Sequence, residues 1–159
     1  LRAAIGVNRE RSDGMALKGK CACGAVGFEI LKDQKEVGPC HCDICRAWTG
    51  GVFFGIQAGA DEARLTGEEH LTIWKSSDWA ERAFCSKCGS SMFYRLTMPG
   101  PMQGEYHFAA GGLEDWGDLK MVGEIYVDKK PDAYEFAGDH PRLTEAEFMA
   151  SIGMEAPPS

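Results

Sequence analysis

The chain has 159 residues, 44% of them hydrophobic, which is enough for one domain with a substantial core. Its net charge is −7, and the densest basic stretches, KDQK and DKK, each contain an aspartate. Because a nucleic-acid binder needs a basic surface to displace phosphate counterions, this charge balance disfavours a nucleic-acid partner. The apolar runs are too short for a transmembrane helix, so we expect no membrane partner either.

The predicted elements are short and mostly strands. Residues 1–14 are polar and lack the apolar centre of a signal peptide, so we expect a disordered tail on a cytoplasmic protein. Seven runs then follow that are rich in aromatic or β-branched residues and bounded by Gly, Pro, Ser or Asp. In chain order they are VGFEI, GVFFGIQA, LTIWKSS, ERAFC, SMFYRL, EYHFAA and EIYV. This pattern predicts an all-β domain over residues 15–143.

A helix is indicated close to the C-terminus, in LTEAEFMASIG. Thr144 and Glu147 have the spacing of a capping box, in which each residue satisfies a backbone N–H of the other. We therefore expect a short helix and a loose tail over residues 144–159.

The seven cysteines carry the strongest chemical signal. In a reducing cytosol, clustered cysteines bind metal or do chemistry more often than they form disulfides, and an odd number cannot pair completely. Four thiolates close a tetrahedral zinc site, whereas three leave a position for water or substrate. The three groups are Cys21 and Cys23 (C-x-C), Cys40, Cys42 and Cys45 (C-x-C-x-x-C), and Cys85 and Cys88 (C-x-x-C-G).

The last group, Cys85 and Cys88 followed by Gly89, is typical of a zinc knuckle, because the glycine lets the turn close around the metal. A knuckle needs two further ligands, and spacing alone leaves both the first pair and two of the middle three as candidates. The middle three are close enough to form a tripod by themselves, which favours Cys21 and Cys23 as the partners of the knuckle. Such a site would also stabilise the fold.

Histidine is a weaker candidate for a ligand. If the chain is extended at His41, its side chain points away from a metal held by the cysteines on either side, so we expect a packing or supporting role. The other histidines, His70, His107 and His140, stand alone in the sequence, and we expect them to be structural or solvated.

Polar groups that follow the tripod are candidate substrate contacts. They are Arg46, Thr49 and Gly50. The Arg46 guanidinium could bind a carboxylate in a forked geometry, or it could form a structural salt bridge. Three nearby aromatic residues are expected to pack in the core rather than line a pocket: Trp48, Phe53 and Phe54.

Four segments, GKCACGAVGFEI, PCHCDICRAWTG, RAFCSKCGSSMFYR and AAGGLEDWGDLKMVGEIYVDKKPDAYEF, occur in this order. With them, the chain resembles the glutathione-dependent formaldehyde-activating enzymes, the GFA or CENP-V type. The resemblance implies an Mss4-like β-tent of short antiparallel strands with two zinc ions. It implies a structural zinc on Cys21, Cys23, Cys85 and Cys88, and a second zinc in an open site on Cys40, Cys42 and Cys45.

The resemblance also implies a carbon–sulfur lyase that joins glutathione and formaldehyde reversibly as S-hydroxymethylglutathione, or acts on a related thiol and aldehyde. Zinc at an open position lowers the pKa of a bound thiol. Three thiolate ligands weaken its Lewis acidity, so we favour thiol capture over water activation. Two positions depart from the family pattern: Ala47 follows Arg46 where a second basic residue is usual, and Glu124 stands where histidine is common.

Two other functions fit the same cysteines. A non-catalytic, zinc-stabilised module that binds a small thiol or a protein would have its middle site closed by His41 or by a distant fourth ligand. Without metal, the middle cysteines would instead suit a redox sensor. The sequence does not indicate an oligomeric state.

Overall fold

The computed structural model describes residues 16–154, and the tail expected over residues 1–14 lies outside this range. The strands are β1 (Leu17–Lys20), β2 (Gly27–Ile30), β3 (Glu36–Cys40), β4 (Phe53–Ala58), β5 (Ala63–Thr66), β6 (Leu71–Lys75), β7 (Ala80–Cys85), β8 (Ser91–Leu96), β9 (Tyr106–Ala109), β10 (Lys120–Met121), β11 (Glu124–Ile125) and β12 (Arg142–Leu143). The helices are α1 (Asp43–Thr49) and α2 (Glu145–Ser151), with 3₁₀ turns at Glu68–His70, Ala110–Gly112 and Val127–Lys129.

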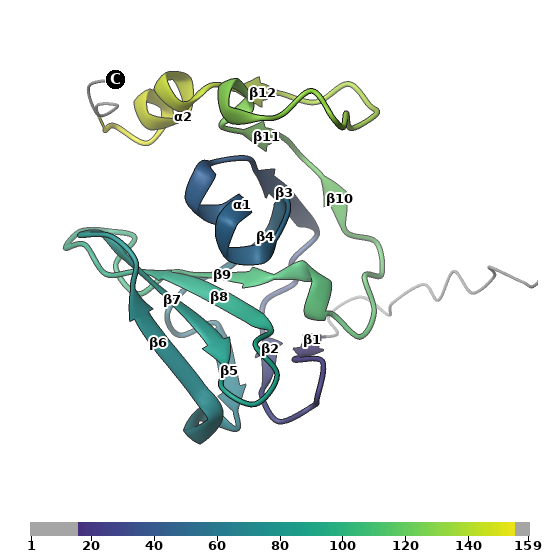
Figure 1. Ribbon diagram of the computed structural model, residues 1–159, viewed down its shortest axis with the longest axis vertical. Helices are drawn as coiled ribbons and strands as arrows, with labels where there is room; N and C mark the ends of the chain where they lie inside the picture. The colour runs from purple at the N-terminus through teal and green to yellow at the C-terminus, as the bar shows by residue number, and fades with distance from the viewer. Residues whose placement is uncertain (1–15, 155–159) are drawn as a thin grey trace, which may run out of the picture.

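Within the described residues the strands form two sheets (Figure 1). The smaller sheet has the order β1-β2-β5 and is antiparallel. The larger has the order β12-β11-β3-β4-β9-β8-β7-β6, with β10 paired to the side of β3. Each of the seven strand-like runs overlaps one of these strands, so the predicted all-β fold with a short C-terminal helix is confirmed.

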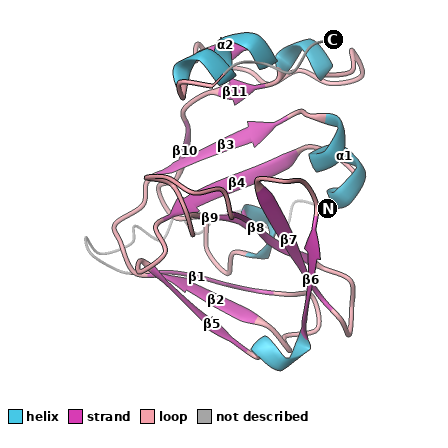
Figure 2. Cartoon of the chain, turned by 90° about the vertical axis from the view of Figure 1, so that its left-hand side faces the viewer, coloured by secondary structure: helices cyan, strands magenta, loops and turns pink. Residues whose placement is uncertain are grey.

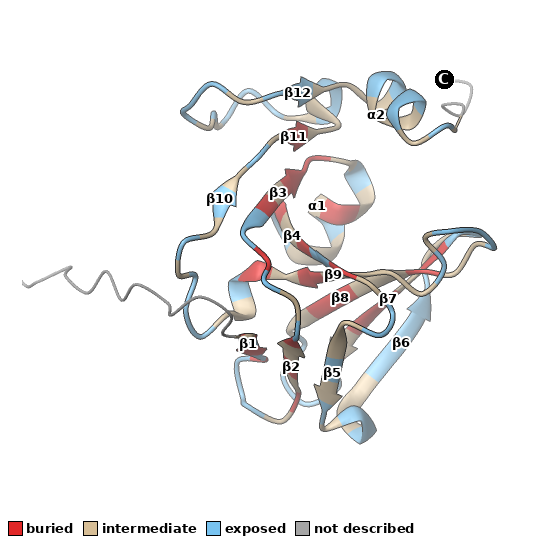
Figure 3. Ribbon diagram, turned by 180° about the vertical axis from the view of Figure 1, so that it is seen from behind, coloured by how far each residue is buried: buried red, intermediate tan, exposed pale blue. Residues whose placement is uncertain are grey.

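The main core lies between the two sheets. The Phe28 ring of the smaller sheet stacks on Phe108 of the larger one at 4.5 Å between centroids, and Phe93 meets Phe108 edge-on at 5.7 Å. Buried residues run along β3, β4, β7, β8 and β9 (Figure 3). Gly19 allows this packing, because a Cβ there would lie 2.2 Å from the Phe28 ring.

The β12 end of the larger sheet, together with α2, forms a covering layer over the end of β3 and α1 (Figures 1 and 2). It is made of β11, β12 and α2, and β11 runs parallel to β3 with Ile125 opposite Cys40. The expected capping box at the start of α2 is present: Thr144 Oγ1 accepts from the Glu147 N–H at 3.3 Å, and Glu147 Oε2 accepts from the Thr144 N–H at 2.8 Å. Neither α1 nor α2 is long and apolar enough to cross a membrane, within the described part of the chain.

The aromatic residues near the tripod divide between two positions. Phe53 is buried, as expected, and its ring meets Trp48 at 5.6 Å and Tyr94 at 5.7 Å. Trp48 and Phe54 are partly buried and pack against the edges of the core clusters. All three also line a pocket that does not include the cysteines of the tripod.

Candidate metal centres and the adjoining cavity

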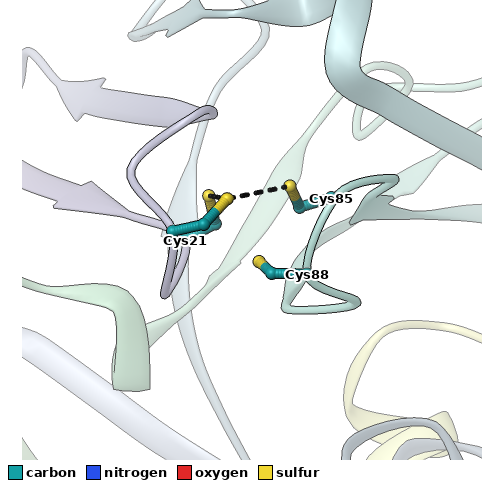
Figure 4. Close-up of side chains that lie close together, drawn as sticks. Cys21, Cys85 and Cys88 are labelled. Carbon is teal, nitrogen blue, oxygen red and sulfur yellow. Dashed lines mark hydrogen bonds between the residues drawn. The ribbon is translucent and has the colours of Figure 1, made fainter.

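One pair of turns brings four cysteines together. The sulfur atoms of Cys21, Cys23, Cys85 and Cys88, the four-cysteine cluster, all lie within 4.8 Å of one another. Figure 4 shows three of them facing the same space from two separate turns. The Cys21–Cys23 and Cys23–Cys85 sulfur separations are 3.5 and 3.8 Å. A tetrahedral site with zinc–sulfur bonds of about 2.3 Å requires sulfurs about 3.8 Å apart, so the cluster could hold such an ion.

Local backbone geometry explains this arrangement. After β1 the chain turns at Gly24, whose φ is +77°, and the Gly24 N–H donates to the Cys21 carbonyl at 3.0 Å. After β7 it turns at Gly89, whose φ is +75°, and the Gly89 N–H donates to the Cys85 carbonyl at 2.8 Å. Both φ values lie in the left-handed region that glycine adopts at little cost. The Val26 N–H also donates to Cys21 Sγ at 3.3 Å, which favours the thiolate form of that ligand.

The tripod, Cys40, Cys42 and Cys45, forms where β3 passes into α1. Cys40 ends the strand, Cys42 is the N-cap of the helix with extended backbone angles, and Cys45 lies in the first turn. Their sulfurs also lie within 4.8 Å of one another. In the described part of the chain, no other His, Cys, Asp or Glu joins them. The tripod could therefore hold a metal ion and leave one coordination position to a ligand from outside the chain.

The three thiols of the tripod share one thiolate. Hydrogen bonding from the Cys40 thiol, and then from Cys45, lowers the pKa of Cys42 to about 3, and the Arg82 charge acts in the same direction. The same interaction with Cys42 raises the pKa of Cys40 well above its ordinary value. Among the three, Cys42 is the group whose surroundings most favour the thiolate form.

Arg82, on β7, is a buried cation directly beside the tripod. It is 2% exposed, and its Nη2 donates to Cys45 Sγ at 3.5 Å. The guanidinium also lies 5.5 Å from the ring centroids of both Trp48 and Tyr94, and Nη1 donates to Ser76 Oγ. Its Nε has no hydrogen-bond partner among the described residues. A buried cation is costly unless it is compensated, and here the negative charge of the tripod compensates it.

His41 points away from the tripod. Its Nε2 lies 2.9 Å from Glu124 Oε2, and its Nδ1 lies 2.8 Å from the Tyr134 hydroxyl. Glu124 Oε1 accepts from His140 at 2.6 Å and from Arg142 at 3.0 Å. Both ring nitrogens of His41 are therefore engaged away from the metal position, as the extended-chain interpretation predicts. Glu124 is fully buried in this network.

A cavity of about 250 Å³, the tripod cavity, opens beside the three cysteines. Its remaining walls come from β4, β7, β8, β9, β11 and α2, from residues that flank β7, β11 and α2, and from the connection over residues 97–105. The four-cysteine cluster contributes no residue to the described lining of this cavity. The two clusters thus differ in surroundings: the cysteines of the tripod line a space that can receive a small ligand, whereas those of the four-cysteine cluster do not line it.

The three candidate substrate contacts lie on α1, outside the lining of the tripod cavity as described. Arg46 donates through Nε to the His41 carbonyl at 2.9 Å and through Nη2 to Asp43, so it already forms a salt bridge. Thr49 Oγ1 donates to the Cys45 carbonyl at 2.9 Å, and Gly50 ends the helix with a φ of +74°. Their predicted contact with substrate stays a prediction.

A family model described as glutathione-dependent formaldehyde-activating enzyme matches residues 16–129. The chain belongs to this family. The resemblance inferred from the cysteine motifs is therefore confirmed, and the match lies within the domain predicted over residues 15–143. All three cysteine groups of this family member lie inside the matched segment.

Two relatives of this family member match it over most of its length. An uncharacterized lyase of Schizosaccharomyces pombe is 27% identical over 135 residues, which is 85% of this chain and 96% of that protein. A Halomonas elongata protein named as a glutathione-dependent formaldehyde-activating enzyme is 30% identical over 158 residues, 89% and 99% of the two chains. A crystal structure of a Rhodobacter sphaeroides protein shares the fold, with a TM-score of 0.50 and 23% identity over 79% of this chain and 98% of that one.

Two residues that line the tripod cavity, Arg82 and Tyr126, were not predicted from the sequence. Arg82 lies in the strand-like run ERAFC, where alternation places it on the face opposite Ala83, but charged residues are rarely expected inside a protein. Tyr126 lines the cavity with a φ of +60°, unusual for a bulky side chain. The alternation of the strand could have indicated the position of Arg82, whereas no feature of the sequence indicated the position of Tyr126.

Proposed function

We propose that the protein is a zinc-dependent carbon–sulfur lyase that acts on a thiol and an aldehyde, with glutathione and formaldehyde as the reference pair. The observation that carries this proposal is the convergence of three cysteine sulfurs on the wall of a cavity of about 250 Å³. The family match and the names of the two relatives support the same chemistry. A reducing compartment such as the cytoplasm would keep these thiols available.

The two clusters would hold two zinc ions with different roles. Cys21, Cys23, Cys85 and Cys88 would hold the structural ion, because four thiolates complete a tetrahedral site. Cys40, Cys42 and Cys45 would hold the second ion and leave one position for the substrate. Bound there, zinc would lower the pKa of the substrate thiol and so supply a thiolate at neutral pH.

The residues around the tripod support this role by charge and by shape. Three thiolates and one divalent ion carry a net negative charge, and the Arg82 guanidinium beside Cys45 offsets it. The cavity walls hold the aldehyde next to the thiol and exclude water, which favours addition by proximity. Arg46, Thr49 and Gly50 remain candidate contacts for the parts of the thiol that extend beyond the cavity.

Metal content and thiohemiacetal formation measured together test the proposal. The chain should bind two zinc ions and accelerate exchange between glutathione, formaldehyde and S-hydroxymethylglutathione, followed by NMR exchange spectroscopy. Cys42→Ser should reduce the zinc content to one ion and abolish the acceleration, while Ser151→Ala on exposed α2 should change neither.

Two results would contradict the proposal. Two bound zinc ions without any acceleration, together with a fourth protein ligand at the tripod, would favour the non-catalytic binding module. Unchanged catalysis in Cys42→Ser would remove the tripod from the reaction altogether.

A further inference from the structure

The walls of the tripod cavity away from the cysteines are mainly apolar. Four methionines line it, together with Trp79, Tyr126 and aromatic and aliphatic side chains of β8, β11 and α2. Methionine is flexible and polarisable, and it is common on surfaces that adapt to apolar ligands. The four are Met98, Met102, Met149 and Met154.

One helix contributes an apolar stripe to this wall. Phe148, Met149 and Ile152 lie on one face of α2 at helical spacing, and all three line the cavity. Within the described residues, none of the α2 side chains is fully buried. The stripe therefore keeps part of its apolar surface uncovered along the cavity, and a ligand that covers it would gain hydrophobic free energy.

The charged groups in the cavity wall are already paired with protein atoms. Arg82 donates to Cys45 and to Ser76. His107 Nε2 lies 2.9 Å from Glu105 Oε1, and its ring stacks on Tyr94 at 4.3 Å. An ionised glutathione carries two carboxylates, and these would find no unengaged cation in the described lining and would meet the Glu105 carboxylate. The cavity is thus poorly suited to the body of glutathione.

The size of the cavity sets the size of its ligand. Pockets for drug-sized ligands span roughly 300–1,000 Å³, and the tripod cavity, at about 250 Å³, lies just below this range. Formaldehyde would leave most of this space empty, whereas an aldehyde with a chain of a few carbons would fill it.

We infer that the tripod cavity selects an aldehyde with an apolar body of about six carbons, which lies against α2 while its carbonyl carbon lies at the tripod. This inference rests on the proposed function. The thiol sulfur forms a bond to the carbonyl carbon, the carbonyl π bond breaks, and the thiol proton ends on the new hydroxyl group, so no oxidant or reductant is consumed. The reverse reaction releases the same aldehyde and thiol.

Rates for a series of linear aldehydes test the inference. With the zinc-loaded full chain and glutathione, kcat/KM should rise about fourfold for each methylene from propanal to hexanal, as expected for burial of each methylene in an apolar site. A flat series, or one that falls with length, would overturn the inference and leave the proposed function standing.

A matched pair of α2 variants locates the effect. Met149→Glu places a carboxylate in the cavity wall, whereas Ala150→Glu places the same group on the exposed side of the same helix. The length dependence should disappear in the first variant and persist in the second. Equal slopes in both variants would overturn the assignment of this wall.

Binding of an unreactive analogue separates this inference from the proposed lyase activity. Hexan-1-ol should bind the zinc-loaded chain at least tenfold more tightly than propan-1-ol, measured by NMR titration, and Met149→Glu should remove the difference. This result would support an apolar site even if no aldehyde is turned over. Absence of alcohol binding, with a dimer that Met149→Glu dissociates, would instead identify the α2 stripe as an interface between two copies and overturn the inference.

Discussion

At the scale of single residues, the site depends on one buried cation and one shared thiolate. Arg82 is held by Cys45, Ser76 and two aromatic rings, so its charge is fixed beside the tripod rather than free to bind solvent anions. A cation in this position favours the thiolate forms that a metal requires. Its contribution should therefore appear first in metal affinity.

Arg82→Met should weaken zinc binding at the tripod about 10- to 100-fold, as do other losses of groups that support metal ligands. The stability of the fold should change less, because an apolar side chain replaces a costly buried charge. Competition with a chromophoric chelator measures the affinity. Arg95→Met is the matched control, since Arg95 pairs with Glu81 and Tyr106, and an equal loss there would show that the effect is not local.

The shared thiolate makes a separate prediction about protons. At pH 7, Cys42 with a pKa of about 3 is ionised, whereas Cys40 keeps its proton. Hydrogen bonding with Cys40 lowers the pKa of Cys45, whereas hydrogen bonding with Cys42 and burial raise it. The resulting pKa of Cys45 is about 11, so this thiol is protonated as well. Zinc binding at the tripod should then release about two protons, and the apparent affinity should rise about a hundredfold per pH unit near neutrality.

Calorimetry in buffers of different ionisation enthalpy counts these protons. The measurement is made on Cys88→Ser as well as on the parent chain, so that binding at the four-cysteine cluster can be subtracted. Release of about three protons would show that the tripod holds no thiolate before the metal arrives.

At the scale of elements, the sequence predicted strands better than the pieces that build the tripod. Alternation and turn residues identified seven strands, but β3 contains Gly38 and Pro39, which are both rare inside strands. The seven-residue α1 was missed because so short a helix is marginal alone, and its N-cap Cys42 makes no side-chain capping bond. Tertiary contacts with β4, rather than local propensity, favour helix at this place.

Glu124 joins the covering layer to the strand that ends in the tripod. Burial raises the pKa of its carboxyl, but hydrogen bonds from His140 and His41 outweigh this effect and lower it overall. Glu124→Gln should reduce the free energy of unfolding by about 2 kcal/mol, because one of the two buried oxygens that accept from His41, His140 and Arg142 is replaced by an amide donor. Urea denaturation of the zinc-loaded chain measures this.

The control for this prediction is Glu135→Gln, which removes an exposed carboxylate paired with Lys130 at 3.3 Å. It should change stability by less than about 0.5 kcal/mol. Because folding lowers the pKa of Glu124, this residue stabilises the fold at pH values above its ordinary pKa of 4.5. The stabilisation is lost as the pH falls through the lower pKa of the folded state. A Glu124→Gln variant as stable as the parent at neutral pH would contradict the linking role.

At the scale of the whole molecule, the cavity could not be inferred from spacing. Its lining comes from the tripod, from Gln57, from residues 79–107 and from residues 125–154, which become neighbours only through the sheet order β11-β3-β4-β9-β8-β7. The cysteine groups, by contrast, could be recognised in the sequence, because the members of each group are close together in a local turn. The apolar character of the cavity, and the burial of Glu124 away from it, therefore emerge only in three dimensions.

The four-cysteine cluster connects the two sheets, since Cys21 and Cys23 follow β1 of the smaller sheet and Cys85 and Cys88 belong to the end of β7 in the larger. If it holds zinc, the binding energy of the ion contributes directly to folding. Cys88→Ser should then lower Tm by at least about 10 °C, because several kcal/mol of metal binding are lost. The Cys88 side chain is exposed, so lost packing cannot explain such a change.

Cys42→Ser should lower Tm by less than about 5 °C, because the tripod lies within the larger sheet and the helix that follows β3, and does not join that sheet to the smaller one. Differential scanning calorimetry of the zinc-loaded variants decides the matter, and equal losses in the two would contradict the division into a structural and an open site.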